Sequence, residues 1–148
     1  EQLTFKSIRM SVRTAKSVWN GTLKDGKGTM NFSNYSGPFT FVSRFEEGPG
    51  TNPEELIGAA HSGCYSMFLS ALISGEKLVP ESVETTASVH LGKDDKGPLI
   101  TTIELDCTVK CDGLSQEKFK ELAAAAKEGC PISRLVAAAD IKLKATLV

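Results

Sequence analysis

The 148-residue sequence lacks the features that mark several common classes of protein. Lysine and arginine total 17 against 18 aspartates and glutamates, and no run of like charge exceeds a few residues, so neither nucleic acid nor a charged membrane surface is an expected partner. No apolar stretch reaches membrane-spanning length without polar residues in it, and no signal-peptide pattern is present, so no membrane partner is expected either. We therefore expect a cytoplasmic protein that acts on a small molecule.

Disulfide and metal-binding patterns are also missing. The four cysteines, Cys64, Cys107, Cys111 and Cys130, include no Cys-x-x-Cys pair, and the chain has two histidines, so neither a disulfide framework nor a zinc site is expected. The roles that remain for these thiols are packing in the core and redox chemistry. Cys107 and Cys111 fall on one face of the alternating segment ITTIELDCTVKC, which predicts that both belong to the core.

The length and the hydrophobic content of 41 % are typical of one domain with a real core. We predict an N-terminal extension over residues 1–16 and a single domain over residues 17–148, and the sequence leaves open whether residues 1–9 are native chain, tag or targeting remnant. Short strands separated by turns are predicted between residues 11 and 45, with a turn at 34–37 and a strand PFTFVSRF that ends near Arg44. Two further strands, SVETTASVHLG and PLITTIELDCTVKC, are joined by a predicted hairpin turn at 93–97.

A long helix is predicted within TNPEELIGAAHSGCYSMFLSALI, residues 51–73. Asn52 can cap it, Pro53 suits the first helical position, and Glu54 and Glu55 match the positive end of the helix dipole. Nearly every later residue of this segment is apolar or small, which predicts a helix buried on most of its circumference.

Two more helices and a strand complete the predicted fold. SQEKFKELAAAAKEG has a helical apolar stripe, and CPISRLVAAA predicts a short helix with Cys130 at or next to its N-cap. The final segment, DIKLKATLV, alternates as a strand does. The order of these elements predicts an α+β fold with antiparallel sheets and a long central buried helix.

The local surroundings of the other two thiols, Cys64 and Cys130, predict which of them is the more reactive. A helix N-terminus stabilises a thiolate at Cys130, whereas burial within a helix raises the pKa of Cys64, so Cys130 is the more reactive candidate on this basis. A nearby cation would reverse the ranking, and Arg44, just before the loop that leads into the long helix, can supply it. His61, one turn before Cys64, is predicted to be a core histidine with satisfied polar atoms, although a place in the site stays open.

SRFEEGPGTNPEELIGAAHSGCYSM, followed later by KEGCPISRL, resembles the OsmC/Ohr family of cysteine-dependent hydroperoxide reductases, and most of all its OsmC branch. The resemblance implies a homodimer of intertwined α+β subunits with two active sites at the interface. It places the peroxidatic cysteine on Cys64, the resolving cysteine on Cys130, the arginine on Arg44 and the glutamate on Glu54. This assignment reverses the ranking from local chemistry.

The resemblance implies a thiol-dependent peroxidase. The Cys64 thiolate would reduce organic hydroperoxides and hydrogen peroxide, the resulting sulfenic acid would condense with Cys130 to a disulfide, and an external dithiol would reduce that disulfide without metal, haem or flavin. The alternative is a non-catalytic redox-sensing or ligand-binding dimer that uses the same cysteine pair.

The spacing within the long helix agrees with a site shared between two chains. Glu54 and Cys64 are ten residues apart, about 15 Å of helical rise, which is too far for both side chains to share a small pocket within one chain. A second copy of the helix would have to supply Glu54, which two helices related by a twofold axis can do. The small residues of the run Gly58 to Gly63 are consistent with a close approach of helices, and a crowded core within one chain would use the same residues.

Overall fold

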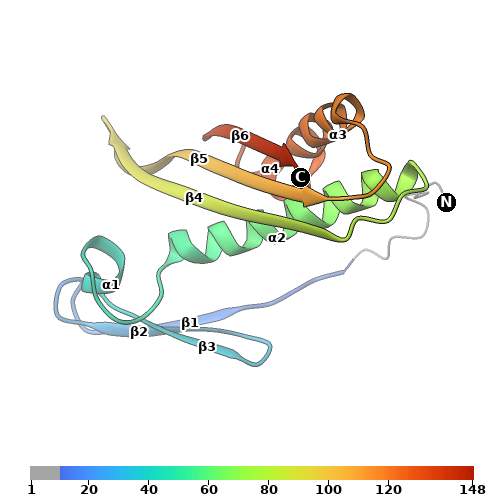
Figure 1. The fold of residues 1–148 in the computed structure, drawn as a ribbon. Coiled ribbons are helices and arrows are strands. Elements are labelled where there is room, and N and C mark those ends of the chain that lie inside the picture. Colours follow the sequence, from blue (N-terminus) through green and yellow to red (C-terminus); the bar gives the residue numbers. More distant parts are fainter. Residues whose placement is uncertain (1–10) are drawn as a thin grey trace. The chain divides into compact units, whose positions relative to one another are not determined.

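The computed structural model describes residues 11–148, which divide into two compact units, residues 11–56 and residues 57–148 (Figure 1). Residues 1–10, and with them most of the predicted extension over residues 1–16, lie outside the described part of the chain. The elements in chain order are β1 Lys16–Asn20, β2 Lys27–Phe32, β3 Tyr35–Phe39, α1 Phe41–Phe45, α2 Pro53–Gly75, β4 Ser82–Asp94, β5 Gly97–Lys110, α3 Gln116–Gly129, α4 Pro131–Leu135 and β6 Asp140–Leu147.

In the first unit, β1, β2 and β3 form an antiparallel meander, which confirms the short strands expected before residue 40. Phe32 pairs with Tyr35, so the second turn consists of Ser33 and Asn34 alone, with Ser33 at a φ of 46°. The turn predicted at 34–37 is therefore wrong, because residues 35–37 already belong to β3. A two-residue connection is a common link between two twisted antiparallel strands.

The strand predicted to run to Arg44 is also wrong, since it ends at Phe39 and is followed by the short helix α1. Thr40 and Ser43 form a capping box: the Ser43 amide donates to Thr40 Oγ1 over 3.1 Å, and the Thr40 amide donates to Ser43 Oγ over 2.8 Å. These two reciprocal bonds satisfy backbone donors that a helix start leaves open. The alternation of apolar residues indicated a strand, but the capping side chains favour a helical turn, and Arg44 lies in it.

The start of α2 is as predicted. The Glu55 amide donates to Asn52 Oδ1 over 2.7 Å, Pro53 is the first helical residue, and the helix ends at Gly75. Its buried stripe is formed by one residue per turn, namely His61, Tyr65, Leu69 and Ile73. The prediction of burial around most of the circumference is wrong for the single chain, because the small residues Ala59, Ala60 and Gly63 are exposed, as is Met67. By length and apolar composition alone, α2 would also be sufficient to cross a membrane, a test that core helices of water-soluble proteins pass as well.

The second unit is built on the sheet β4–β5–β6. β4 and β5 form the predicted antiparallel hairpin, with Asp94 paired to Gly97 across the turn. β5 and β6 pair in parallel, with Ile103 opposite Ile141, so the expectation of purely antiparallel sheets is wrong for this pair. The reason is the connection between them: it contains α3 and α4, and a crossover through helices returns the chain in the same strand direction. The α+β class itself is confirmed.

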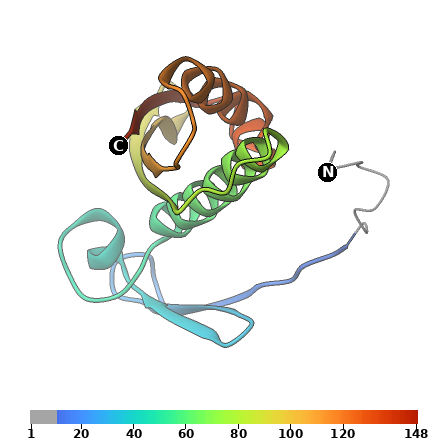
Figure 2. The ribbon, with the colours of Figure 1, turned by 45° about the vertical axis from the view of Figure 1, so that its right-hand side comes forward.

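The core of the second unit lies between one face of this sheet and the helices α2 and α3, which lie on the same side of it (Figure 2). The buried face of β5 consists of alternate residues, Ile103, Leu105, Cys107 and Val109, and Cys111 follows just beyond the strand. α2 and α3 are joined by a hydrogen bond of 3.1 Å from the Tyr65 hydroxyl to the Ala123 carbonyl. The predicted core positions of Cys107 and Cys111 are confirmed, since their exposed fractions are 0 % and 8 %.

Alanine at Cys107 is expected to lower the free energy of unfolding by about 1 to 2 kcal/mol, because it removes a small buried side chain and leaves a cavity. The rate at which Cys64 is alkylated in the folded protein should not change, since Cys107 lies on β5. Denaturant unfolding and iodoacetamide kinetics measure the two quantities, with Cys111→Ala as the matched variant. A large change in Cys64 alkylation in folded Cys107→Ala would contradict the assignment of Cys107 to packing.

Candidate active site

Two thiols from distant parts of the sequence meet in the second unit. Cys64 lies in the middle of α2, and Cys130 lies between α3 and α4, where it is the N-cap of α4. Their sulfur atoms are 3.1 Å apart, with the Cys130 thiol donating to Cys64 Sγ. A disulfide bond would bring the sulfurs to about 2.05 Å, so a movement of about 1 Å would be enough to form one. The two free thiols are therefore close enough to form a disulfide once an oxidant has acted on one of them.

Exposure and hydrogen bonding distinguish the two thiols. Cys64 is half-buried, whereas the exposed fraction of Cys130 is 0 %. Burial raises the pKa of the Cys64 thiol, the Ile132 amide that hydrogen-bonds to its sulfur lowers this pKa, and the neighbouring Cys130 thiol raises it further. Cys130 Sγ accepts the Ser133 amide over 3.4 Å, as expected for a helix N-cap. A small oxidant can reach Cys64 from solvent more easily than Cys130.

His61 lies one turn before Cys64 on the same helix and is fully buried. Its Nε2 is 2.7 Å from Ser133 Oγ, on α4, and Ser133 is itself 3 % exposed. His61 Nδ1 is buried without a hydrogen-bond partner among the described residues. Burial lowers the pKa of His61, which favours the neutral imidazole. The prediction of a core histidine with hydrogen-bonded ring nitrogens is thus confirmed for Nε2 and wrong for Nδ1.

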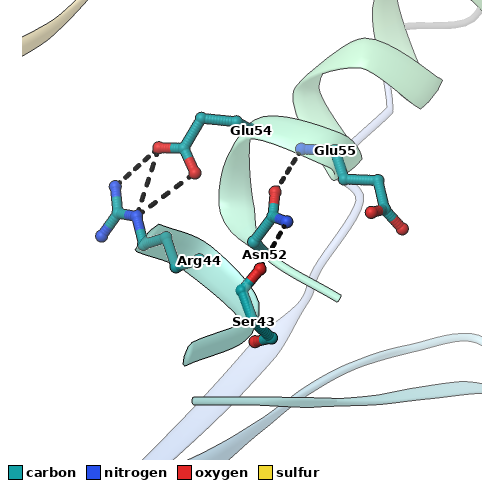
Figure 3. Close-up of polar contacts among 5 residues, drawn as sticks. All are labelled: Ser43, Arg44, Asn52, Glu54 and Glu55. Atoms are coloured by element: carbon teal, nitrogen blue, oxygen red, sulfur yellow. Dashed lines mark hydrogen bonds and ion pairs between the residues drawn. The ribbon is translucent and has the colours of Figure 1, made fainter. Parts of the chain in front are cut away.

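In the first unit, Arg44 and Glu54 form an ion pair (Figure 3). Arg44 Nη2 donates to Glu54 Oε1 over 2.7 Å, and Arg44 Nε lies 3.2 Å from Oε2 and 3.3 Å from Oε1. The Glu54 side chain is 11 % exposed and that of Arg44 is 35 % exposed. The carboxylate therefore holds one edge of the guanidinium, and Nη1 on the other edge donates no hydrogen bond to any described residue.

Polar contacts between α1 and the start of α2 bring this ion pair together. Ser43 Oγ donates to the Thr51 carbonyl over 2.7 Å. Figure 3 shows a second contact, in which Asn52 Nδ2 donates to the Ser43 carbonyl over 3.0 Å. Asn52 thus caps α2 with its oxygen and holds α1 with its nitrogen. These contacts orient α1 so that Arg44, in its last turn, faces Glu54 in the first turn of α2.

A cavity of about 370 Å³ lies beside Arg44 in the same unit. Aromatic side chains dominate its lining, which consists of Trp19, Gly21, Leu23, Phe39, Thr40, Phe41, Arg44 and Phe45. The guanidinium carbon of Arg44 is 5.2 Å from the centre of the Phe45 ring, and the rings of Trp19 and Phe39 are also 5.2 Å apart. A guanidinium at the side of an aromatic cavity can bind a molecule with one polar end and one apolar end.

The four predicted site residues therefore form two pairs, Cys64 with Cys130 and Arg44 with Glu54, each within its own unit. In residues 11–148 no group of three or more histidine, cysteine, aspartate or glutamate side chains is arranged to hold a metal ion.

Sequence reasoning missed two groups that contact the site, Ser133 and the Ile132 amide. The spacing of Cys130 and Ser133 is the available signal, since an N-cap residue followed three positions later by a polar residue is typical of a helix start.

Comparison with known proteins identifies relatives over most of the chain. The family described as OsmC-like protein matches residues 46–145. Peroxiredoxin OsmC of Escherichia coli strain K12 is 44 % identical over 131 residues, which cover 85 % of this chain and 90 % of that protein. The organic hydroperoxide resistance protein-like 2 of a Staphylococcus epidermidis strain is 30 % identical over 87 residues, covering 59 % of this chain and 61 % of that protein.

Solved structures show the same fold. The OsmC-like protein of Mycoplasma pneumoniae superposes with a TM-score of 0.75 at 13 % identity, covering 93 % of this chain and 98 % of that one. The organic hydroperoxide resistance protein OhrB of Bacillus subtilis superposes with a TM-score of 0.66 at 26 % identity, covering 91 % and 98 %. Both the sequence and the fold thus confirm the resemblance found in the NPEELIGAAHSGC and GCP segments: this chain belongs to the OsmC-like family.

Proposed function

We propose that this protein is a cysteine-based peroxidase that reduces organic hydroperoxides and hydrogen peroxide. The observation that carries the proposal is the pair of thiols 3.1 Å apart, of which Cys64 is accessible and Cys130 is buried. The names of the relatives in Escherichia coli and Staphylococcus epidermidis, a peroxiredoxin and an organic hydroperoxide resistance protein, support the same activity.

In the proposed reaction, the Cys64 thiolate attacks the terminal oxygen of the hydroperoxide. The O–O bond breaks, Cys64 becomes a sulfenic acid, and the alkoxide that leaves takes a proton from solvent to become an alcohol. The Cys130 sulfur then attacks the sulfenic sulfur, and the hydroxyl group leaves with the thiol proton as water. An external dithiol reduces the Cys64–Cys130 disulfide by exchange and is itself oxidised, so the protein returns to its starting state without a resident cofactor.

Arg44 would activate Cys64, and Glu54 would hold Arg44 in place. A guanidinium stabilises a thiolate and can donate to a peroxide oxygen, and the free Nη1 edge of Arg44 is suited to this role. Glu54 and Cys64 are separated by ten residues of α2, about 15 Å of helical rise. We therefore assign the activation of Cys64 to the Arg44–Glu54 pair of a second copy of the chain.

An exposed face of α2 supports a homodimer. Ala59, Ala60, Gly63 and Met67 lie on it, and Met67 is 76 % exposed. A Cβ atom built on Gly63 would meet nothing within 4 Å, so this part of the helix has room for a close partner. Small residues along a helix allow another helix to approach closely, and a twofold axis would then complete two equivalent sites.

The aromatic cavity beside Arg44 supports hydroperoxides with an apolar organic group as substrates. Its volume of about 370 Å³ lies within the range of small-molecule sites, and aromatic walls favour an apolar group. Hydrogen peroxide needs only the arginine and the thiolate, so we expect both kinds of peroxide to be consumed.

The test is a peroxidase assay with hydrogen peroxide and with cumene hydroperoxide, each combined with a thioredoxin-type dithiol and with a dihydrolipoyl dithiol. We expect continuous consumption of both peroxides with at least one dithiol. Oxidation of one equivalent followed by no turnover with any dithiol would support the alternative, a redox-sensing dimer. Failure of Cys64 to react with any peroxide would reject both proposals.

A further inference from the structure

We propose that His61 and Ser133 form a positioning pair that holds α4 docked on α2 and so keeps the Cys130 thiol within bonding reach of Cys64. The inference rests on the proposed function, because it assigns this pair to the step in which Cys130 forms the disulfide. Neither residue touches the peroxide in this proposal, and both act through the placement of Cys130.

The geometry consists of two matched contacts between the same two helices. His61 and Cys64 are one turn apart on α2, and Cys130 and Ser133 are one turn apart at the start of α4. Cys64 contacts Cys130 over 3.1 Å, and His61 contacts Ser133 over 2.7 Å. Cys64 Sγ also accepts the Ile132 amide of α4, and the contact of His61 with Ser133 adds an anchor one turn away along α2 that helps to fix the rotation of α4.

α4 needs such an anchor because it is short. It has five residues, and a helix of this length has little stability of its own. Among the described residues, the side-chain hydrogen bonds from α2 to residues 130–135 come from Cys64 and His61 alone. Ser133 also donates its amide to Cys130 Sγ over 3.4 Å, so one residue is bonded both to His61 and to the resolving thiol.

The chemistry of His61 is consistent with a role beyond filling the core. Its Nδ1 is buried without a partner among the described residues. A buried polar atom without a hydrogen bond lowers the stability of the fold, and an apolar side chain at this position would not have that effect. Burial lowers the pKa of His61, and a neutral imidazole has one donor and one acceptor, so Nε2 can bond to the Ser133 hydroxyl in either tautomer. The hydrogen bond to Ser133 is therefore the feature of His61 that an apolar residue could not replace.

The pair should control how fast the disulfide forms. In this step the Cys130 sulfur forms a bond to Cys64 Sγ, the S–O bond of the sulfenic acid breaks, and the hydroxyl group and the thiol proton leave as water. The rate of this step is proportional to the fraction of molecules in which α4 is docked. Loss of the hydrogen bond between His61 and Ser133 lowers that fraction but leaves the attack of Cys64 on the peroxide unchanged.

The experiment follows both steps after mixing with one equivalent of cumene hydroperoxide, in wild type, Ser133→Ala, His61→Leu and His61→Gln. Peroxide loss reports the first step, and loss of the sulfenic acid, trapped with dimedone at timed intervals, reports the second. In Ser133→Ala and His61→Leu we expect disulfide formation to slow by about tenfold, which corresponds to α4 being docked in about 10 % of the molecules. The rate of peroxide loss should change little in both variants. His61→Gln can place an amide near the position of Nε2 and should restore most of the rate.

Ser66→Ala is the matched control. Ser66 is also on α2, and its hydroxyl donates to Thr85 Oγ1 on β4 over 2.7 Å, so the variant loses a side-chain hydrogen bond of the same length that does not involve α4. We expect it to leave disulfide formation unchanged. The double variant His61→Leu with Ser133→Ala should be no slower than either single variant, because both substitutions remove the same bond.

A second measurement separates this inference from the proposed function. Equilibration with reduced and oxidised glutathione gives the effective concentration of Cys130 towards Cys64 without any peroxide, and we expect it to fall by about tenfold in Ser133→Ala. If wild type fails to reduce peroxides, the proposed function fails, while this equilibrium still tests the positioning pair. An unchanged effective concentration in folded Ser133→Ala, or slower peroxide loss with normal disulfide formation, would overturn the inference.

Discussion

Replacement of Cys64 by serine is expected to reduce hydroperoxide consumption to the uncatalysed level, whereas Cys130→Ser should still consume one equivalent. Cys64 is the half-buried thiol that a peroxide can reach, and Cys130 is fully buried behind it. Without Cys130 the sulfenic acid on Cys64 has no resolving thiol, so it should accumulate and the reaction should stop after one turnover.

Single-turnover peroxide loss, with intact-mass measurement of the oxidised protein, distinguishes the two variants. Cys130→Ser should gain the mass of one oxygen on Cys64, and wild type should lose two hydrogens as the disulfide forms. Cys111→Ala is the control for loss of a buried thiol elsewhere in the second unit. The roles of the two cysteines would have to be exchanged if Cys64→Ser still reacted and Cys130→Ser did not. That result would favour the ranking from local chemistry, in which the helix N-cap activates Cys130.

Replacement of Arg44 by methionine is expected to raise the pKa of Cys64 in the proposed homodimer and to remove most of the peroxidase activity. Burial already raises this pKa in the single chain, and the Ile132 amide opposes the shift only in part. A guanidinium about 4 Å from a thiolate contributes up to about 4 kcal/mol at an effective dielectric constant near 20, close to three pKa units. Its loss should therefore reduce the thiolate fraction at neutral pH by about a hundredfold or more.

The variant Arg44→Lys tests the positive charge at position 44 separately from the planar shape of the guanidinium. Lysine keeps the positive charge but loses the planar group that Glu54 holds by Nε and Nη2, so part of the pKa effect should remain while the peroxide rate falls substantially. Glu54→Gln is the companion variant, because it keeps the shape of the side chain and removes the charge that orients Arg44.

The measurement for these variants is the pH dependence of Cys64 alkylation together with the peroxide rate constant. Only the thiolate reacts, so below the pKa the alkylation rate should rise about tenfold per pH unit and level off above it. A higher pKa in Arg44→Met moves this curve to higher pH and lowers the rate at neutral pH. If folded Arg44→Met kept both the wild-type curve and its peroxidase activity, another group would have to activate Cys64.

The sequence determined most elements of secondary structure because their signals are local. Asn52, Pro53 and the two glutamates after them predict the start of α2, and the structure confirms it with the hydrogen bond from the Glu55 amide to Asn52. The alternation around Cys107 likewise predicts the buried face of β5. The family was recognisable from the NPEELIGAAHSGC and GCP segments alone, since both are short, specific and contiguous.

Tertiary structure decided the features that depend on competition between local signals or on contacts between distant residues. The alternating residues before Arg44 favour a strand, but the capping box of Thr40 and Ser43 and its bonds to the start of α2 make α1 a helix. The parallel pairing of β6 depends on the path of α3 and α4, which no pattern within β6 records. The meeting of Cys64 with Cys130, and of His61 with Ser133, depends on α4 docking on α2. Each residue of these pairs lies far from its partner in sequence, so no local signal brings them together. The family resemblance implied the pairing of Cys64 with Cys130, and packing of the unit places the buried thiol beside the accessible one.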